Sequence, residues 1–451
     1  MPGIIGRDRF REVADAALEL PGADDVEVLF LHEWGGLTRF ANSEIHQSTS
    51  REDTALRVRV AIGGRVGVAQ ANDFSPAGAV VAARSAKEMA DVVAPDPLWA
   101  GLAGPASFAD VDRFDEDTAQ ISPGQRADSV GGLIAQVPEG YRAAGAYETQ
   151  AMEVGVATST GQTCWGPMTQ ASITTVVTGD EQASGFAERF AGTAGELDAV
   201  AIGATAAGKA VDSRSPRALD PGTYAVVLEP NAVATLVGFL AFIGFGGRDY
   251  IEGRSCFSGR AGEKVADETV SIWDDASGDG MLGLTFDFEG EPRSRVDLIR
   301  DGVFVDTVYD RRTAKQAGRT DGSTGHGLPS PNPQGPFPLH LFMGAGDASL
   351  GDMVAATERG LLVTRFHYAN VVNPMESSIT GMTRDGTFLI ENGEIAGPVR
   401  NFRFTQSILG ALSAVSMIGR DSELASEFFF SASRVPALKI ESFNFSGASD
   451  H

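Results

Sequence analysis

The chain has 451 residues, 43% of them hydrophobic and 21% charged. At a usual size of roughly 150 residues per domain, this is enough for two or three domains with sizeable cores. The chain carries 60 acidic and 36 basic residues, a formal net charge of -24, and concentrates no basic patch. Because such a charge repels phosphate backbones and anionic lipid, we expect no nucleic-acid partner and no membrane partner.

Cysteine usage and apolar runs indicate the compartment. Cys164 and Cys256 are the only cysteines and form no Cys-x-x-Cys pair, so a disulfide scaffold is not expected. The longest uncharged apolar run, residues 232–245, is shorter than the roughly 20 residues that span a bilayer. Since the N-terminus also lacks a basic segment followed by an apolar one, the sequence predicts a cytoplasmic protein.

The first half of the chain predicts a mixed α+β domain. Residues 54–70 alternate apolar and polar side chains on either side of Gly63-Gly64, which is the pattern of a β-hairpin. Helices are predicted at residues 8–20, 75–93, 124–136 and 196–211, and further strands at 26–31, 144–157 and 163–178. Pro and Gly break the periodicity at residues 213–222, which we interpret as a linker after an N-terminal domain of residues 1–212.

The second domain, residues 223–451, is expected to be mainly antiparallel β. Pairs that favour tight hairpin turns recur there: Asp279-Gly280, Asp301-Gly302, Asp321-Gly322, Asp385-Gly386 and Asn392-Gly393. The predicted strands are residues 224–228, 296–299, 303–309, 388–390 and 395–399. An apolar helix at residues 231–247 is expected to pack on this sheet, with Phe239, Phe242 and Phe245 filling space as a plug. The predicted fold class is therefore α+β in two domains.

Seven short motifs occur along the chain in a distinctive order. They are residues 38–47 (TRFANSEIHQ), 256–263 (CFSGRAGE), 324–327 (TGHG), 360–364 (GLLVT), 372–374 (VNP), 390–394 (IENGE) and 417–421 (MIGRD). In order and spacing they resemble the TldD/PmbA family, the modulators of gyrase. Leu-Leu-Val-Thr followed by Val-Asn-Pro is more similar to the PmbA branch, also called TldE, than to TldD.

The resemblance implies a metal motif that this sequence lacks. In catalytic members, the helix before the FSG segment carries His-Glu-x-x-x-His, and a cysteine near the C-terminus is the third zinc ligand. The matching positions here are Gly238, Phe239 and Ile243, and no cysteine follows Cys256. Because a catalytic zinc needs three protein ligands and an open water position, we expect no metal and no catalytic residue in this chain.

The resemblance further implies a TldE-like subunit that does not cut by itself. Such a subunit forms a heterodimer with a TldD-like catalytic subunit, which carries the zinc, and shapes a cleft for an extended peptide. Two alternatives stay open. One is a homodimeric protein that binds a peptide or a small molecule, and the other is an active hydrolase of peptide-like conjugates with an unrecognised site.

A few polar residues are candidates for the cleft or for a subunit contact. Asn42, Glu44 and His46 are favoured by their place in the first motif, with an ordinary exposed hairpin as the alternative. His326, His367 and Asn373 are further cleft candidates. His326 and His340 also flank a Pro-rich loop, so they would form a metal site if the loop folded back, although ordinary loop histidines are commoner.

Overall fold

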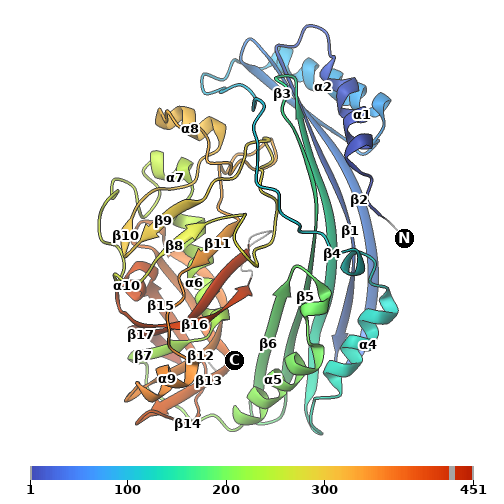
Figure 1. Ribbon diagram of the computed structural model, residues 1–451. Helices are drawn as coiled ribbons and strands as arrows, with labels where there is room; N and C mark the ends of the chain where they lie inside the picture. Colours follow the sequence, from blue (N-terminus) through green and yellow to red (C-terminus); the bar gives the residue numbers. More distant parts are fainter. Residues whose placement is uncertain (1–2, 426–431, 449–451) are drawn as a thin grey trace.

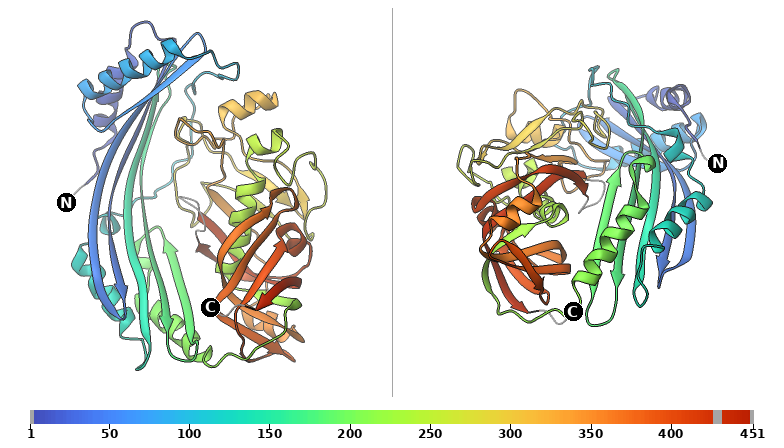
Figure 2. Two further views of the ribbon diagram at one scale, coloured as in Figure 1. Left: turned by 180° about the vertical axis from the view of Figure 1, so that it is seen from behind. Right: turned by 60° about the horizontal axis from the view of Figure 1, so that its bottom comes forward.

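The computed structural model describes residues 3–425 and 432–448. They form two α+β domains side by side (Figure 1), which confirms the predicted fold class. A tall, gently curved sheet is the frame of the N-terminal domain, and a more compact mixed sheet is the frame of the C-terminal domain (Figure 2).

The N-terminal sheet has the strand order β3-β2-β1-β4-β5-β6, and every neighbouring pair is antiparallel. Its strands are β1 (Asp25–Ala41), β2 (Glu44–Ile62), β3 (Arg65–Ala71), β4 (Arg142–Thr158), β5 (Thr163–Thr178) and β6 (Ser184–Ala191). The predicted hairpin at Gly63-Gly64 is confirmed as β2 and β3. β6 was not predicted, and β1 runs well beyond the predicted residues 26–31. In the second half of β1, single buried residues alternate with partly exposed ones. No apolar run there indicated from the sequence that the strand continues.

Helices cover only one face of this sheet (Figures 1 and 2). The helical segments are α1 (Arg7–Leu18), α2 (Pro76–Val92), α3 (Glu116–Ala119), α4 (Pro123–Ile134), the short 3-10 helix η1 (Ala194–Glu196) and α5 (Ala199–Asp212). Phe10 of α1 packs on Phe30 of β1 in one core cluster, and α4 and α5 pack over the other end of the same face. On the opposite face, Leu29 packs with Phe286 of the C-terminal domain. That second face therefore forms one wall of the space between the domains.

The C-terminal sheet is mixed and partly closed. Its strands are β7 (Gly222–Leu228), β8 (Ile272–Asp274), β9 (Val296–Arg300), β10 (Val303–Phe304), β11 (His340–Met343), β12 (Arg359–Asn373), β13 (Ser378–Glu391), β14 (Glu394–Pro398), β15 (Phe402–Ser407), β16 (Val415–Ala425) and β17 (Ala432–Ala448). Strands β7, β12, β13, β15 and β17 pair in sequence, and β17 pairs back to β7. Most pairs are antiparallel, as predicted, but β11 with β17 and β12 with β7 are parallel.

The apolar helix packs against this sheet. Helix α6 (Pro230–Gly244) contacts β12, β16 and β17, and nearly all of its side chains are buried. The predicted single helix is interrupted after Gly244, where Ser255 Oγ donates a 2.6 Å hydrogen bond to the Gly244 carbonyl, and α7 (Gly247–Ile251) follows. The remaining helices are α8 (Arg311–Ala317), α9 (Leu350–Ala355), η2 (Pro374–Glu376) and α10 (Ile408–Ser413). None of the helices in residues 3–425 and 432–448 has the length and apolarity needed to cross a bilayer.

The Asp-Gly and Asn-Gly pairs have different outcomes. Asp301-Gly302 joins β9 to β10 and Asn392-Gly393 joins β13 to β14, and both residues of each pair have positive φ, as a tight hairpin turn requires. Asp385-Gly386 does not turn the chain. It lies inside β13, where a register shift against β12 absorbs the positive φ of both residues, so the turn expected there is replaced by a bulge.

Candidate functional site

Helix α6 carries the three positions at which the resemblance places metal and base residues. Gly238, Phe239 and Ile243 are all buried, and the two larger side chains are each 5% exposed. None of the three offers a nitrogen, oxygen or sulfur ligand from its side chain. Phe245 is fully buried as expected, but Phe242 is 51% exposed. The expectation that Phe242 packs with the other two is wrong, because its ring points out of the core in the last turn of the helix.

The ligand chemistry elsewhere does not fit zinc either. No group of three or more His, Cys, Asp or Glu side chains that could hold a metal ion occurs within residues 3–425 and 432–448. Cys256 is buried next to the end of α6, and burial raises the pKa of its thiol to about 12. Because the thiolate is both the metal ligand and the nucleophile, a thiol held protonated is suited to neither role.

His326 and His340 do come together, on the buried carboxylate of Asp274. His326 Nε2 lies 2.9 Å from Asp274 Oδ1, and the backbone N–H of His340 donates to Asp274 Oδ2 at 2.7 Å. The other ring nitrogen of His326 lies 2.9 Å from Thr324 Oγ1. Burial opposes the charge of Asp274, but the two histidines and their hydrogen bond lower its pKa below the usual range. Both carboxylate oxygens and both His326 nitrogens thus have protein partners, so His326 has no free ring nitrogen for a metal.

The series Thr324, His326, Asp274 has the order of a nucleophile, a base and an orienting acid, but no substrate can reach it. His326 and Asp274 are 0% exposed, and Thr324 is 7% exposed. The Thr324 hydroxyl also donates to the Tyr309 carbonyl at 3.0 Å and accepts from the Tyr309 N–H at 2.7 Å. These hydrogen bonds therefore stabilise the buried loop around Thr324 and His326, and His326 does not line a cleft.

Asn42, Glu44 and His46 lie at the end of the β1–β2 hairpin, far along the sheet from this cluster. Asn42 and Ser43 both have positive φ, so the turn conformation expected of Asn42 is present. All three candidate side chains are exposed. Within residues 3–425 and 432–448, the first part of β2 pairs only with β1, because β3 joins β2 from Leu56 onward. This stretch is therefore an open sheet edge in the described part of the chain.

His367 and Asn373 lie on another projection, the β12–β13 hairpin. His367 is half-buried, and burial followed by Arg384 and Arg365 lowers its pKa. Asn373 caps η2 by accepting a 3.0 Å hydrogen bond from the Met375 N–H. Between and beyond them, three apolar or aromatic side chains are exposed: Tyr368, Val372 and Met375, at 76%, 55% and 48%. Single exposed apolar side chains are common, but three on one hairpin make it a candidate protein contact surface.

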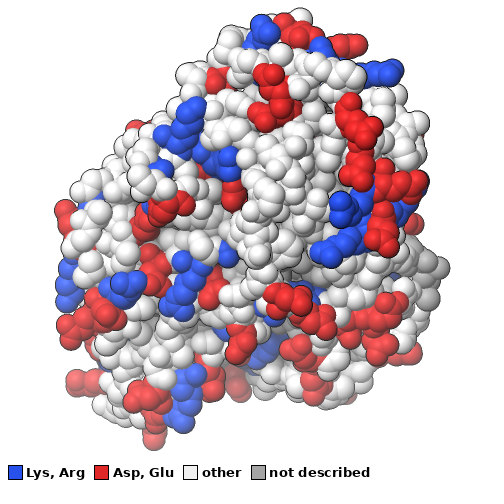
Figure 3. Space-filling model, turned by 45° about the horizontal axis from the view of Figure 1, so that its top comes forward, with Lys and Arg blue, Asp and Glu red and all other residues white. Residues whose placement is uncertain are grey.

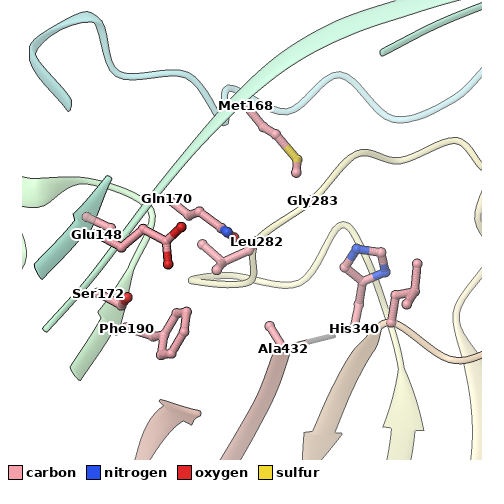
Figure 4. A pocket seen from close by; sticks show the side chains of 11 residues that line it. Glu148, Met168, Gln170, Ser172, Phe190, Leu282, Gly283, His340 and Ala432 are labelled. Carbon is pink, nitrogen blue, oxygen red and sulfur yellow. The ribbon is translucent and has the colours of Figure 1, made fainter. Parts of the chain in front are cut away.

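A cavity of about 120 Å³ lies between the domains (Figure 4). Glu148, Gln170 and Ser172 border it from the N-terminal sheet, and His340 borders it from the opposite side. Met168, Phe190, Leu282, Gly283, Leu339 and Ala432 also line it. Burial, with a smaller contribution from Arg293, lowers the pKa of His340 to about 3, so its imidazole is uncharged at neutral pH.

A larger cavity, of about 300 Å³, lies between the β5–β6 turn and β13. Arg384, Arg400 and Asp385 are among its lining residues. Asp385 accepts a hydrogen bond from Ser184 of the N-terminal domain and forms an ion pair with Arg365 of its own domain. Asp385 thus takes part in the contact between the domains.

Several further bonds fix one domain on the other. Arg59 of β2 is buried with Glu27 and pairs with Glu289 of the C-terminal domain, Nη1 to Oε1 3.1 Å. Others join Gln162 to the Gly290 carbonyl, Arg113 to the Ala276 and Gly278 carbonyls, Arg311 to the Gly101 carbonyl and Thr285 to the Ala109 carbonyl. The walls of both cavities are therefore held in a defined relative position.

The polar residues of β4 and β5 that line the interdomain space were missed from the sequence. Both strands were predicted, and their period-two alternation does place Glu148 with Gln150 on one face of β4, and Gln170 with Ser172 on one face of β5. The sequence did not show that this face meets His340. On the surface, basic and acidic side chains are interspersed over the face in Figure 3, without a broad area of either sign.

The sequence matches two family models. Residues 221–447 match the PmbA/TldA metallopeptidase C-terminal domain, and residues 26–90 match domain 1 of the same metallopeptidases. The fold is similar to the crystal structure of TldE from Thermococcus kodakarensis, with a TM-score of 0.88 at 21% identity, over 97% of this chain and 100% of that one.

Two kinds of relative are similar in sequence. Metalloprotease PmbA of Escherichia coli O157:H7 is 26% identical over 96% of both chains. The metalloprotease TldD homologues of Buchnera aphidicola and Haemophilus influenzae are each 28% identical, over 45% and 51% of this chain. These last alignments cover 42% and 48% of the relatives, so the match spans less than half of their length. The first model alone matches half of the chain, and the chain belongs to the PmbA/TldD family of metallopeptidase-related proteins.

Proposed function

We propose that this chain is a non-catalytic, TldE-like subunit of a TldD/TldE-type metallopeptidase, and that it shapes a cleft for an extended peptide. A TldD-like partner would supply the zinc and the base. We retain residues 1–212 and 223–451 as its two domains and 213–222 as the linker between them.

One observation carries the proposal, namely the nature of α6. At Gly238, Phe239 and Ile243 the helix has buried side chains that can neither bind a metal nor accept a proton. Converting these positions to ligands would place charge-bearing groups in the core, and an unpaired buried charge is strongly unfavourable. The helix thus supports a role in stabilising the C-terminal domain.

The space between the domains suits a peptide. The wall formed by the N-terminal sheet presents polar side chains of β4 and β5 in regular rows. Away from the lining of both cavities, the open edge of β2 offers unpaired backbone groups to an added strand. For the partner contact, the exposed side chains of Tyr368, Val372 and Met375 are the best-supported surface. Tyr368 also has a positive φ, uncommon for a bulky residue, at the register shift of β12 between His367 and Asn370.

We also propose a cytoplasmic location. Cys164 and Cys256 are both buried and unpaired, and free thiols without disulfides are usual in a reducing compartment.

Reconstitution tests the function. The chain should be purified alone, and also with a TldD-like subunit from the same organism, and each sample assayed for zinc by metal analysis and for cleavage of an unstructured peptide. We expect less than stoichiometric zinc and no cleavage with the lone chain. The mixture should contain a complex with zinc and should cleave.

Each alternative has its own outcome. Stoichiometric zinc or cleavage by the lone chain would sink the proposal in favour of a hydrolase. A self-dimer that ignores every TldD-like subunit would favour the homodimeric binding protein.

A further inference from the structure

The cavity between Glu148 and His340 is too small for a whole small-molecule ligand. Its volume is about 120 Å³, whereas pockets for such ligands usually measure about 300–1,000 Å³. A cavity of this size accommodates one side chain. Since the side chain of Glu148 is 46% exposed, the cavity can be reached from outside.

A row of hydrogen bonds crosses the N-terminal sheet and ends at this cavity. Gln150 Nε2 donates to Glu33 Oε2 at 3.3 Å, and Gln170 Nε2 donates to Gln150 Oε1 at 2.7 Å. An ionised carboxylate can only accept. Glu33 therefore fixes the direction of the row, because each amide must turn its NH2 group toward the carboxylate end. Gln170 lines the cavity, and its Oε1 is then the acceptor at the end of the row.

The other polar groups of the cavity add to this acceptor character. Glu148 forms an ion pair with Arg51 of β2, and the 3.9 Å between Oε1 and Nη2 is longer than a hydrogen bond. His340 is 5% exposed, and within residues 3–425 and 432–448 no hydrogen bond reaches either nitrogen of its ring. An uncharged imidazole offers one acceptor nitrogen and does not repel a cation. Arg293, whose charge acts on His340, is itself stabilised electrostatically by the carboxylates of Asp287 and Asp274.

The walls between these groups are apolar. Met168 and Leu282 lie between Gln170 on one side and His340 on the other (Figure 4). A long side chain with a methylene stem and a cationic end matches this distribution, because the stem buries apolar surface while the head keeps its hydrogen bonds. An acidic side chain would face Glu148 and the oxygen of Gln170 without a donor of its own.

We propose that this cavity is a subsite for one basic side chain of the peptide, with its ammonium or guanidinium group bound by Glu148 and Gln170 and its stem held against Met168 and Leu282. The proposal rests on the peptide-binding role proposed above and names the substrate class, a peptide with a lysine or arginine. Glu33 is a positioning residue, since it acts through the direction of the amide row.

Binding of three capped heptapeptides to the full chain tests the subsite. Six alanines surround a central lysine, norleucine or glutamate, and acetyl and amide caps remove the terminal charges. A charge-assisted hydrogen bond contributes about 1.5–3 kcal/mol, so the lysine peptide should bind about tenfold or more tighter than the norleucine peptide in titration calorimetry. The glutamate peptide should bind least.

Variants of the lining residues test whether the preference for the lysine peptide arises in the cavity. Glu148→Gln and Gln170→Leu should each bind the lysine peptide no better than the norleucine peptide, and Glu33→Gln should weaken the preference because the amide row loses its fixed direction. Glu88→Gln, which removes the same charge from the exposed side of α2 on the other face of the sheet, should keep it. Because Glu148 is half exposed, its variant should fold even if Gln170→Leu does not, and circular dichroism checks both.

Equal binding of the three peptides, no binding of any, or a lysine preference that survives in Glu148→Gln would each overturn the subsite. These results do not depend on cleavage. The proposed function is judged separately, by zinc content and proteolysis in the reconstituted mixture, so failure of one is distinguishable from failure of the other.

Discussion

Arg59 and Glu289 form a buried ion pair that links the two domains, with Nη1 and Oε1 3.1 Å apart. Arg59 also donates to Glu27 on the neighbouring strand, and all three residues are at most 8% exposed. Arg59 thus balances the negative charges of two buried carboxylates, one from each domain. The relative position of the domains depends on this cation.

Arg59→Met should destabilise the chain strongly. It leaves Glu27 and Glu289 buried without their cation, and breaking a buried pair in this way costs about 3–5 kcal/mol. The free energy of unfolding can be measured by urea denaturation. Arg312→Ala is the matched control, because Arg312 also pairs across the domains, with Asp96, but is 52% exposed. It should cost less than about 1 kcal/mol, and equal losses would refute the role of burial.

Gly36→Ala should also destabilise, through the side chain of Arg126. Arg126 is 1% exposed and lies against Gly36, and a Cβ at that position would overlap its guanidinium group. Overpacking of this kind typically costs about 1–3 kcal/mol. Gly131→Ala, on the same helix as Arg126 with no atom within 4 Å of the added methyl, should instead stabilise by about 0.5–1 kcal/mol. Thermal melts of the two variants should shift in opposite directions.

The two rings of α6 should differ in their contribution to stability. Phe239→Ala removes a ring that is 5% exposed and should cost about 3–5 kcal/mol. Phe242→Ala removes one that is 51% exposed and should cost clearly less. The comparison is made by denaturant unfolding, with the zinc content followed in parallel. If Phe239→Ala were neutral, α6 would not be the packed element described above.

The stability of the chain should depend on pH through His340. Burial and Arg293 lower its pKa in the folded chain to about 3, from 6.5. Between these values the unfolded chain binds a proton that the folded chain does not, so the free energy of unfolding falls as the pH drops through this window. His340→Gln should show a shallower fall between pH 6.5 and 3 in denaturant titrations. Identical slopes for both proteins would contradict the buried, uncharged state.

The exposed β12–β13 hairpin should be needed for association with a TldD-like subunit. Val372→Asp or Met375→Asp places a charge in the proposed contact and should weaken association tenfold or more, measured by analytical ultracentrifugation of the mixture. Ile395→Asp is the control, because Ile395 on β14 is similarly exposed at 51% and lies outside the hairpin. Unchanged association of both hairpin variants would place the contact elsewhere.

Local patterns accounted for most elements of the N-terminal domain and for fewer of the C-terminal domain, where β12, β15, β16 and β17 were not predicted. The alternation around Gly63-Gly64, the helical periods of α1, α2, α4 and α5, and the turn pair Asn392-Gly393 each depend on residues close in sequence. Prediction failed where distant residues decide. β1 extends to Ala41 because β2 and β4 pair with it on both sides, and Asp385-Gly386 is a bulge because β12 continues past it.

The sequence by itself determined the two-domain α+β class, the family and the absence of ligand side chains at Gly238, Phe239 and Ile243, since these follow from residue types and their order. Only the tertiary structure decided that His326 is buried and hydrogen-bonded to Asp274, whereas His340 borders a cavity. It also decided that Glu148 and Gln170 face His340 across that cavity. Burial and the direction of hydrogen bonds arise from contacts between segments remote in the chain, and no local pattern encodes them.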